Sequence, residues 1–199
     1  MDVSFAIDLL KKGGIVAFPT ETVYGIGCDI FNLNAIKRIY EIKKRDAAKP
    51  LAAHVGSIEQ IKMVAFTDVQ YFDVFCQKFL PGPLAIILPK LQTISSLVTS
   101  GLDTISIRFP DCAEAIDLAL GLGNPIAATS ANLSGMPSAV HHTDVMNYFQ
   151  DNVDFIIKAG TTKFKKESTI VDLTQTPPKI LREGVISKFE IEQILREYS

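Results

Sequence analysis

The chain has 199 residues, of which 47% are hydrophobic and 21% charged, and its formal net charge at pH 7 is −2. This composition provides enough apolar side chains for a sizeable buried core and excludes an intrinsically disordered chain. The charge balance disfavours a protein that binds nucleic acid or acidic lipid through bulk positive charge.

The length predicts a single domain over residues 1–199. The three cysteines, Cys28, Cys76 and Cys112, are far apart and make neither a disulfide framework nor a CxxC metal pair. An acid at Asp2 stands where a secretory signal would carry base, and the longest apolar runs are far shorter than the roughly 20 residues of a membrane-spanning helix. We therefore expect a cytoplasmic protein without membrane contact.

Apolar periodicity and chain breakers predict helices and strands that alternate along the chain. In chain order we expect a helix over 3–12, a strand over 15–18, a helix over 33–44, a strand over 51–55, helices over 57–64 and 67–79, strands over 84–88 and 104–109, a helix over 113–120, a strand over 126–129, a helix over 144–150, strands over 155–157, 169–173 and 180–181, and a C-terminal helix at about 188–198. Ser57 and Thr67 are the hydroxyl N-cap candidates of the helices that they open. This alternation predicts an α/β domain with helices on both faces of one sheet. The sheet is expected to be mixed, because the last strands follow one another without a helix between them.

Several common enzyme motifs are absent from the sequence. There is no GxxxxGK[ST] phosphate loop, no HExxH zinc motif and no GxSxG nucleophile elbow, and Gly25-Ile26-Gly27 lacks the third glycine of a dinucleotide fingerprint. We expect His141-His142 to enter a helix and not to bind metal. These absences disfavour metalloenzymes with a protein-built site, serine hydrolases and common dinucleotide enzymes.

Polar clusters follow two of the predicted strands. Residues 19–27, Pro-Thr-Glu-Thr-Val-Tyr-Gly-Ile-Gly, either line a cleft or form a polar turn against which Tyr24 packs. Residues 127–135, Ala-Ala-Thr-Ser-Ala-Asn-Leu-Ser-Gly, offer hydroxyls and small side chains that suit an oxygen anion, although a plain turn explains them as well.

Two further patterns concern cations. Lys43, Lys44, Arg45 and Lys49 cluster at a helix C-terminus, where they either remain solvated or face a phosphate. Arg108 shares one face of a predicted strand with Thr104 and Ser106, and an arginine on a central strand is costly to bury without an anion. The sequence leaves open whether that anion belongs to a ligand or to a structural ion pair.

Together these segments resemble the YrdC-like family, the threonylcarbamoyl-AMP synthases of tRNA modification. The resemblance runs from Gly13 to Gly184 and rests on motifs in the family's order. These are PTETVYGIG (19–27), KPL (49–51) followed by His54, PGPL (81–84), the S-x-R-x-P strand (106–110), ATSANLSG (128–135), STIVD (168–172) and LREG (181–184). The chain looks like the short form, without the extra C-terminal domain of longer relatives.

The resemblance implies an open cleft on a twisted, mixed α/β sheet and a nucleotidyltransferase activity. Such an L-threonylcarbamoyladenylate synthase joins L-threonine, bicarbonate or CO2, and ATP, and releases pyrophosphate. A partner threonylcarbamoyl-transferase complex would then pass the group to adenosine 37 of tRNA, forming t6A. Mg2+ is expected with ATP, bridging its phosphates with few protein ligands, and no residue is assigned as a metal ligand. Contact with tRNA is expected to be weak or indirect.

Matching motif positions imply a role for each site residue. The resemblance implies that Lys49 and Arg45 are catalytic residues and that they bind the triphosphate. The threonine substrate is expected to contact Thr22, His54, Arg108, Ala128 and Ser168. ATP is expected to contact Arg45, Lys49, Thr104, Ser130, Asn132, Ser138 and Arg182.

Two alternatives to this function stay open. The basic set Lys37, Arg38, Lys43, Lys44, Arg45 and Lys49 fits an RNA-binding module of the same fold without catalysis, although the net charge of −2 and the lack of interleaved aromatic residues argue against it. The second alternative is a carbamoyl-transferring relative with a different acceptor, which would normally carry extra domains. The sequence also leaves open whether the loop over 161–166 or the C-terminal helix closes the site.

Overall fold

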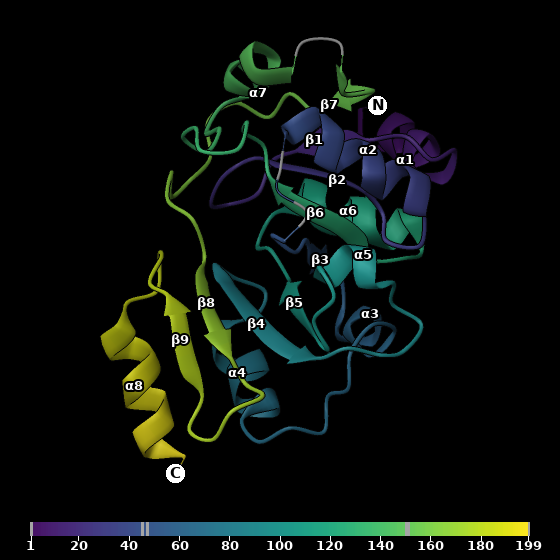
Figure 1. Ribbon diagram of the computed structural model, residues 1–199. Coiled ribbons are helices and arrows are strands. Elements are labelled where there is room, and N and C mark those ends of the chain that lie inside the picture. Colours follow the sequence, from purple (N-terminus) through teal and green to yellow (C-terminus); the bar gives the residue numbers. More distant parts are fainter. Residues whose placement is uncertain (1, 45, 47, 150–151, 199) are drawn as a thin grey trace.

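Helices and strands alternate along the chain in the computed structural model, which describes residues 2–44, 46, 48–149 and 152–198 (Figure 1). The strands are β1 (Val16–Phe18), β2 (Gly25–Asp29), β3 (Ala52–His54), β4 (Leu84–Pro89), β5 (Thr104–Arg108), β6 (Ile126–Ser130), β7 (Phe155–Ile156), β8 (Thr169–Asp172) and β9 (Lys179–Arg182). The helices are α1 (Asp2–Lys11), α2 (Leu33–Lys43), α3 (Ile58–Lys62), α4 (Phe72–Phe79), α5 (Ser96–Thr99), α6 (Ala113–Leu122), α7 (His142–Phe149) and α8 (Lys188–Glu197). Within this described part, no helix is long and apolar enough to span a membrane.

All nine described strands belong to one sheet, in the order β7-β1-β2-β6-β3-β5-β4-β8-β9. Three neighbouring pairs are parallel, namely β1 with β7, β3 with β5 and β4 with β8, and the other neighbours are antiparallel. The predicted α/β class with a mixed sheet is therefore confirmed. Figure 1 shows the sheet extending from β7 at one end of the molecule to β9 at the other, with α8 outside β9.

The structure adds two elements that the apolar pattern does not predict, β2 and α5. β2 reads Gly-Ile-Gly-Cys-Asp and lacks the β-branched run of a typical strand. It is nevertheless a strand, buried between β1 and β6, where a Cβ at Gly27 would lie 2.6 Å from Ile126 Cγ2. α5 has only four residues, too few for a helical periodicity to show.

The sequence correctly predicts the N-cap of α3 but not the start of α4. Ser57 caps α3 as expected, because its hydroxyl accepts a hydrogen bond from the Gln60 amide at 3.3 Å. The helix expected from residue 67 begins only at Phe72, after Tyr71 in the left-handed conformation with φ 72°. Thr67 is therefore not its N-cap, and the expectation was wrong at this end.

The two faces of the sheet support separate apolar cores. The larger core packs α2, α3, α4, α7 and α8 against one face, through side chains such as Ile39, Phe75 and Ile191. The smaller core packs α1 and α6 against the other face, through Leu10, Leu118 and their neighbours. The prediction of helices on both faces is thus confirmed.

On the second face, the residues of the central strands that point away from the larger core are left to line a cleft. Two pairs of neighbouring residues on β3 and β5 lie on this face. They are Ala52 with Ser106 and, two residues further along, His54 with Arg108. Their sequence neighbours Ala53 and Ile107 point into the larger core, because side chains alternate along a strand.

The larger core generates the first test. Replacing Phe75, which is fully buried in α4, with alanine is expected to lower the free energy of unfolding by about 3–5 kcal/mol, through lost burial and a residual cavity. Phe189→Ala in α8 is the matched control, because that side chain is 70% exposed and its loss should change stability by no more than about 0.5 kcal/mol. Urea unfolding of both variants measures the difference; equal losses would contradict this assignment of the core.

Candidate active site

A cleft of about 630 Å³ opens over the centre of the sheet. Its lining comes from several segments spread along the chain, from the turn after β1 to β9. The described lining residues include Thr20, Thr22, Lys43, Lys49, Ala52, His54, Ala85, Ile87, Ser106, Arg108, Ala128, Ser130, Asn132, Ser134, Glu167, Ser168, Ile170, Leu181 and Arg182. The described lining residues include four cationic side chains, Lys43, Lys49, Arg108 and Arg182, and one carboxylate, that of Glu167. Such a lining suits an anionic ligand with several oxygen atoms.

The floor of the cleft consists of alternate residues from neighbouring strands. Ala128 on β6 pairs with Ala52 on β3, and Ala85 on β4 pairs with Arg108 on β5. The alanines leave room above the backbone, because a methyl group fills little of the space that a larger side chain would occupy. The small residues predicted at the end of β6 therefore border a real cleft.

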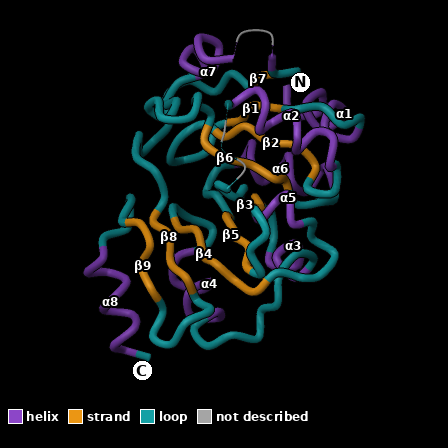
Figure 2. Tube along the Cα trace, in the orientation of Figure 1, coloured by secondary structure: helices purple, strands orange, loops and turns teal. Residues whose placement is uncertain are grey.

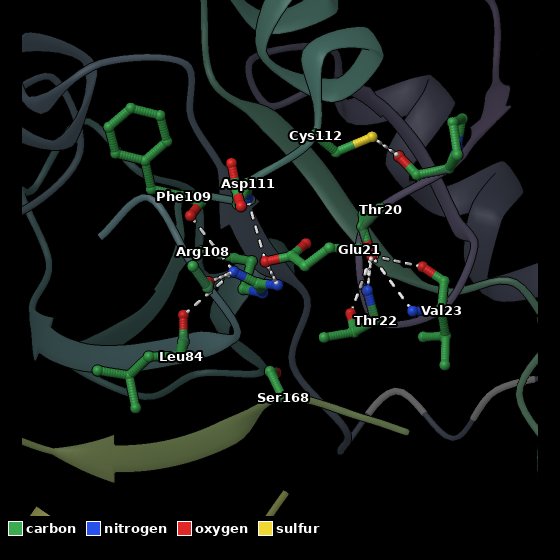
Figure 3. A network of polar contacts seen from close by, with 12 residues as sticks. Thr20, Glu21, Thr22, Val23, Leu84, Arg108, Phe109, Asp111, Cys112 and Ser168 are labelled. Atoms are coloured by element: carbon green, nitrogen blue, oxygen red, sulfur yellow. Dashed lines mark hydrogen bonds and ion pairs between the residues drawn. The ribbon is translucent and has the colours of Figure 1, made fainter. Parts of the chain in front are cut away.

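A compact turn after β1 presents a threonine to this cleft. Thr20 Oγ1 donates to the Val23 carbonyl at 2.6 Å and accepts from the Thr22 and Val23 amides at 3.2 and 3.3 Å (Figure 3). Thr20 and Thr22 hydroxyl oxygens are 2.8 Å apart. Since a hydroxyl has one hydrogen and that of Thr20 is used, Thr22 donates to Thr20 and keeps its lone pairs for a ligand.

Arg108 forms a buried ion pair with Glu21 of the same turn. Its Nη2 lies 2.7 Å from Glu21 Oε1, and the two side chains are only 4% and 2% exposed. Nη1 donates to the carbonyls of Gly82, Leu84 and Phe109, while Oε1 of Glu21 also accepts from the Asp111 amide at 3.1 Å. Figure 3 shows the guanidinium directed at Glu21, with Ser168 nearby. Within the structure, the anion of Arg108 is therefore a structural one.

The ion pair still leaves Arg108 able to bind a ligand. The guanidinium has five N–H donors, and among the described residues the Nε hydrogen and one Nη2 hydrogen have no acceptor. Arg108 also lines the cleft. Burial lowers the pKa of Arg108, and the charge of Glu21 opposes that shift. A structural anion on one edge and a ligand on the other are thus compatible.

His54 lies beside Arg108 as a neutral side chain. Burial, assisted by the charge of Arg108, lowers the pKa of His54 from 6.5 to about 3. The ring packs edge-to-face on Phe18, with centroids 5.6 Å apart, and its buried Nδ1 has no hydrogen-bond partner among the described residues. A neutral imidazole at this position can exchange a hydrogen bond with an amino-acid ligand without adding charge.

Lys43 is a buried residue that organises the loop after β6. Its side chain is 1% exposed, and Nζ donates to the backbone carbonyls of Ser130 and Asn132 at 2.5 Å each. The Lys43 carbonyl in turn accepts from the Ser134 amide at 3.1 Å. Ser130 Oγ donates to Asn132 Oδ1 at 2.7 Å. The loop is therefore fixed both by a hydrogen bond within it and by its hydrogen bonds to Lys43.

Glu167 joins three segments of the chain at the wall of the cleft formed by the start of β8 and by Arg182 of β9. Its carboxylate forms an ion pair with Arg182 Nη1 and accepts from Ser138 Oγ at 2.8 Å. Arg182 also donates from Nε to the Ser168 carbonyl at 3.0 Å and from Nη2 to Ser168 Oγ at 3.3 Å. Both charged side chains are 40% exposed, in contrast to the buried pair of Glu21 and Arg108.

The segment between β7 and β8 crosses from one end of the sheet to the other and leads to this wall (Figure 2). Tyr24 holds its beginning, because the hydroxyl donates to the Gly160 carbonyl at 3.0 Å and accepts from the Ala159 amide at 3.1 Å. The Phe164 amide donates to the Glu21 carbonyl at 2.8 Å. The loop over 161–166 therefore lies against the turn after β1. The described residues of α8 that border a cavity line a different groove, against β9.

The structure brings most of the predicted site residues together. Those that line the cleft are Thr22, Lys49, His54, Arg108, Ala128, Ser130, Asn132, Ser168 and Arg182. Thr104 is not among the lining residues; it lies at the far end of β5, opposite Pro89. Ser138 is also absent from the described lining residues, but its hydroxyl donates to Glu167, which does line the cleft, and Arg45 lies outside the described residues.

The predicted set omits Glu21, Lys43 and Glu167. Glu21 and Lys43 belong to motifs that the sequence does single out, but as a possible turn and as part of a basic cluster. Glu167 directly precedes the STIVD motif, and its only available signal was that position. Its partners lie 29 and 15 residues away along the chain, so no local pattern marks it.

Comparison with known proteins supports a common origin. The model of the family Sua5_yciO_yrdC, described as "Telomere recombination", matches residues 8–184. The threonylcarbamoyl-AMP synthase of Pyrococcus abyssi is 40% identical over 195 residues, which cover 98% of this chain and 57% of that protein. A putative threonylcarbamoyl-AMP synthase of Mycobacterium leprae is 33% identical over 193 residues, covering 97% of this chain and 87% of that protein. The chain thus spans about half the length of the longer curated relatives, at 57%, 56% and 49%.

The fold also matches a solved structure. The crystal structure of P. abyssi Sua5 complexed with L-threonine agrees with a TM-score of 0.95 and 40% identity, over 98% of this chain and 58% of that chain. The likeness therefore includes nearly every described element of the sheet and its helices.

The state of His54 predicts how stability depends on pH. Because the folded chain excludes a proton down to about pH 3, whereas the unfolded chain takes it up near pH 6.5, the free energy of unfolding should fall as the pH drops below 6.5. At pH 5 this one group should account for about 2 kcal/mol, at about 1.36 kcal/mol per pH unit. In the His54→Asn variant the decline between pH 7 and pH 5, measured by urea unfolding, should be shallower. Parallel declines in both proteins would refute a neutral His54 in the folded chain.

Proposed function

We propose that this chain, which belongs to the Sua5/YciO/YrdC family, is a nucleotidyltransferase that makes threonylcarbamoyl-adenylate from L-threonine, bicarbonate or CO2, and ATP. The observation that carries the proposal is the composition of its cleft. A pocket of hydroxyls, a neutral histidine and an already paired arginine adjoins a rim of cations. The relative crystallised with L-threonine shares this fold at a TM-score of 0.95.

The threonine substrate is assigned to the pocket around Arg108. The free edge of its guanidinium would take the carboxylate, since Arg108 offers two adjacent N–H donors there. The Thr22 hydroxyl, with its lone pairs available, and the neutral His54 would contact the amine and side-chain hydroxyl. Ala128 and Ser168 would complete the pocket from β6 and from the start of β8.

The nucleotide is assigned to the cationic side of the same cleft. Lys49 lies on its rim, and together with Arg45 it would neutralise the triphosphate. Ser130 and Asn132, fixed by Lys43, and Arg182 on β9 would hold the nucleotide and its phosphates. Thr104 and Ser138 remain proposed nucleotide contacts, although neither is among the described residues that line the cleft. To contact them, the nucleotide would have to reach past the present lining.

Mg2+ would enter as part of the Mg·ATP substrate. Among the described residues no group of three or more His, Cys, Asp or Glu side chains could hold a metal ion, and Glu167 is the one carboxylate of the described lining. This donor set suits a cation held mainly by phosphate oxygens, as Mg2+ commonly is in nucleotide sites.

The reaction asks for positioning and charge neutralisation more than for acid–base groups. The threonine amine adds to CO2 and loses a proton, which gives a carbamate. A carbamate oxygen then attacks the α-phosphorus of ATP, forming the new P–O bond as the bond to pyrophosphate breaks. The leaving pyrophosphate gains negative charge, so Lys49 and its neighbouring cations would stabilise the transition state.

The product would be consumed by a partner transferase that places the threonylcarbamoyl group on adenosine 37 of tRNA. The carbamoylated adenylate is a mixed anhydride and therefore an activated donor. A tRNA contact by this chain itself would be weak or indirect.

The proposal predicts an unusual substrate requirement. Because the carboxylate of threonine is held and the amine must first become a carbamate, pyrophosphate release should need threonine and bicarbonate together. The measurement is pyrophosphate release from Mg·ATP in CO2-depleted buffer, with and without added bicarbonate. L-serine should react with a kcat/KM about 10- to 200-fold lower, the range for one missing methyl-sized contact. Threonine-dependent release that ignores bicarbonate would overturn the assignment, and no release at all beside tight tRNA binding would favour an RNA-binding module.

The two halves of the cleft should separate kinetically. Thr22→Val, which keeps the shape but removes the hydroxyl, should raise the KM for threonine about 10-fold and leave the KM for ATP nearly unchanged, with Thr22→Ser as the matched control that retains the hydroxyl. Lys49→Met should act on ATP and on kcat instead. Steady-state pyrophosphate release provides both constants. If each variant affected both substrates equally, the division of the cleft would be wrong.

A further inference from the structure

Two arginines face the cleft, and each is paired with a glutamate, but the two pairs differ in burial. Arg108 and Glu21 are 4% and 2% exposed, and three carbonyls fix the guanidinium in addition. Arg182 and Glu167 are each 40% exposed. A buried pair cannot exchange its partner without stranding a charge, whereas an exposed pair adds little to stability and can be replaced by a stronger ligand.

The Glu167 carboxylate uses the donors that a nucleotide phosphate needs. Its two oxygens bind the Arg182 guanidinium and the Ser138 hydroxyl, both of which are proposed nucleotide contacts. It is the one carboxylate among the described lining residues, in a cleft that also presents Lys43, Lys49 and Arg108. Glu167 therefore acts as an internal anion within a cationic site.

The backbone of Glu167 is fixed, so that exchange requires movement of the side chain alone. Its carbonyl accepts from the Val185 amide at 3.1 Å. Gly184 allows this close approach, because a Cβ there would lie 2.2 Å from the Glu167 carbonyl oxygen and 2.5 Å from the Thr169 nitrogen. Arg182 likewise keeps its bonds to the Ser168 carbonyl and hydroxyl when the carboxylate leaves.

We propose that Glu167 occupies a phosphate subsite formed by Arg182 and Ser138, and that a phosphate of the nucleotide displaces it on binding. The inference rests on the proposed function, since it takes Mg·ATP as the ligand of this cleft. A phosphate offers three oxygens and more charge than a carboxylate, and the planar guanidinium accommodates either. The Glu167 side chain turns toward solvent when it is displaced.

The direction of the change in Mg·ATP affinity distinguishes displacement of Glu167 from a role in which Glu167 helps to hold the nucleotide. Glu167→Gln removes the competing charge and keeps the side-chain size, so Mg·ATP should bind about two- to fivefold more tightly, the factor that corresponds to one exposed ion pair. The affinity for adenosine, which has no phosphate, and for L-threonine should not change. Calorimetric titration of each probe into the wild type and the variant measures the three affinities.

Control variants separate local from general effects. Glu183→Gln makes the same change of net charge at an exposed residue next to Arg182 in sequence. Because Glu183 lines the groove against α8, this variant should leave the Mg·ATP affinity unchanged. Glu167→Ala should tighten Mg·ATP binding in the same direction as Glu167→Gln. In an Arg182→Gln background the gain from Glu167→Gln should largely disappear, because the carboxylate then has little left to block.

Several outcomes would overturn the proposal. Mg·ATP binding that is weaker or unchanged in Glu167→Gln would show that Glu167 supports the nucleotide or does not meet it. An equal gain for adenosine would show a general change of the cleft. A wild-type chain that binds no Mg·ATP would overturn the proposed function and this inference with it, whereas wild-type binding that Glu167→Gln weakens would overturn this inference alone.

Discussion

The cleft depends on one buried charge pair, that of Arg108 and Glu21. The pair joins the turn after β1 to β5 across 87 residues of sequence, in a place where neither charge reaches bulk water. Its desolvation is offset by the carbonyls of Gly82, Leu84 and Phe109 and by the Asp111 amide, so the loops that carry these groups must converge on it. The positions of the Thr20–Thr22 turn and of the chain break before β4 are consequences of this requirement.

The same sheet supplies both a rigid support and an open binding surface. Along β3, β5 and β6, one set of alternating side chains enters the larger core, while the other set faces the cleft where α1 and α6 do not cover it. Because these strands lie in the middle of a nine-stranded sheet, the cleft-facing residues sit on the part of the molecule least free to move. Residues that must hold several reacting groups in line benefit from such a floor.

Much of this architecture follows from local patterns, and the remainder depends on contacts between distant segments. The apolar runs of β1 and β4 and the periodicity of α2 predict those elements to within a residue or two at each end. Gly25 and Gly27 obscure β2, since its strand character comes from burial between neighbours and not from its own residues. Lys43 looks like part of a solvated basic cluster, although the backbone carbonyls of Ser130 and Asn132 bury it. Glu167 could not be identified because its partners come from two other segments.

The segment that carries Glu167 has a dynamic consequence. Between β7 and β8 it lies on the protein with no regular structure of its own, attached at Tyr24, at the Glu21 carbonyl and at Val140. Because few hydrogen bonds attach this segment, we expect residues 159–164 to open locally at a lower free energy than β5. One wall of the cleft is therefore attached more weakly than its floor, and the Tyr24 hydroxyl, bonded to both Gly160 and Ala159, is one of the contacts that any local opening must break.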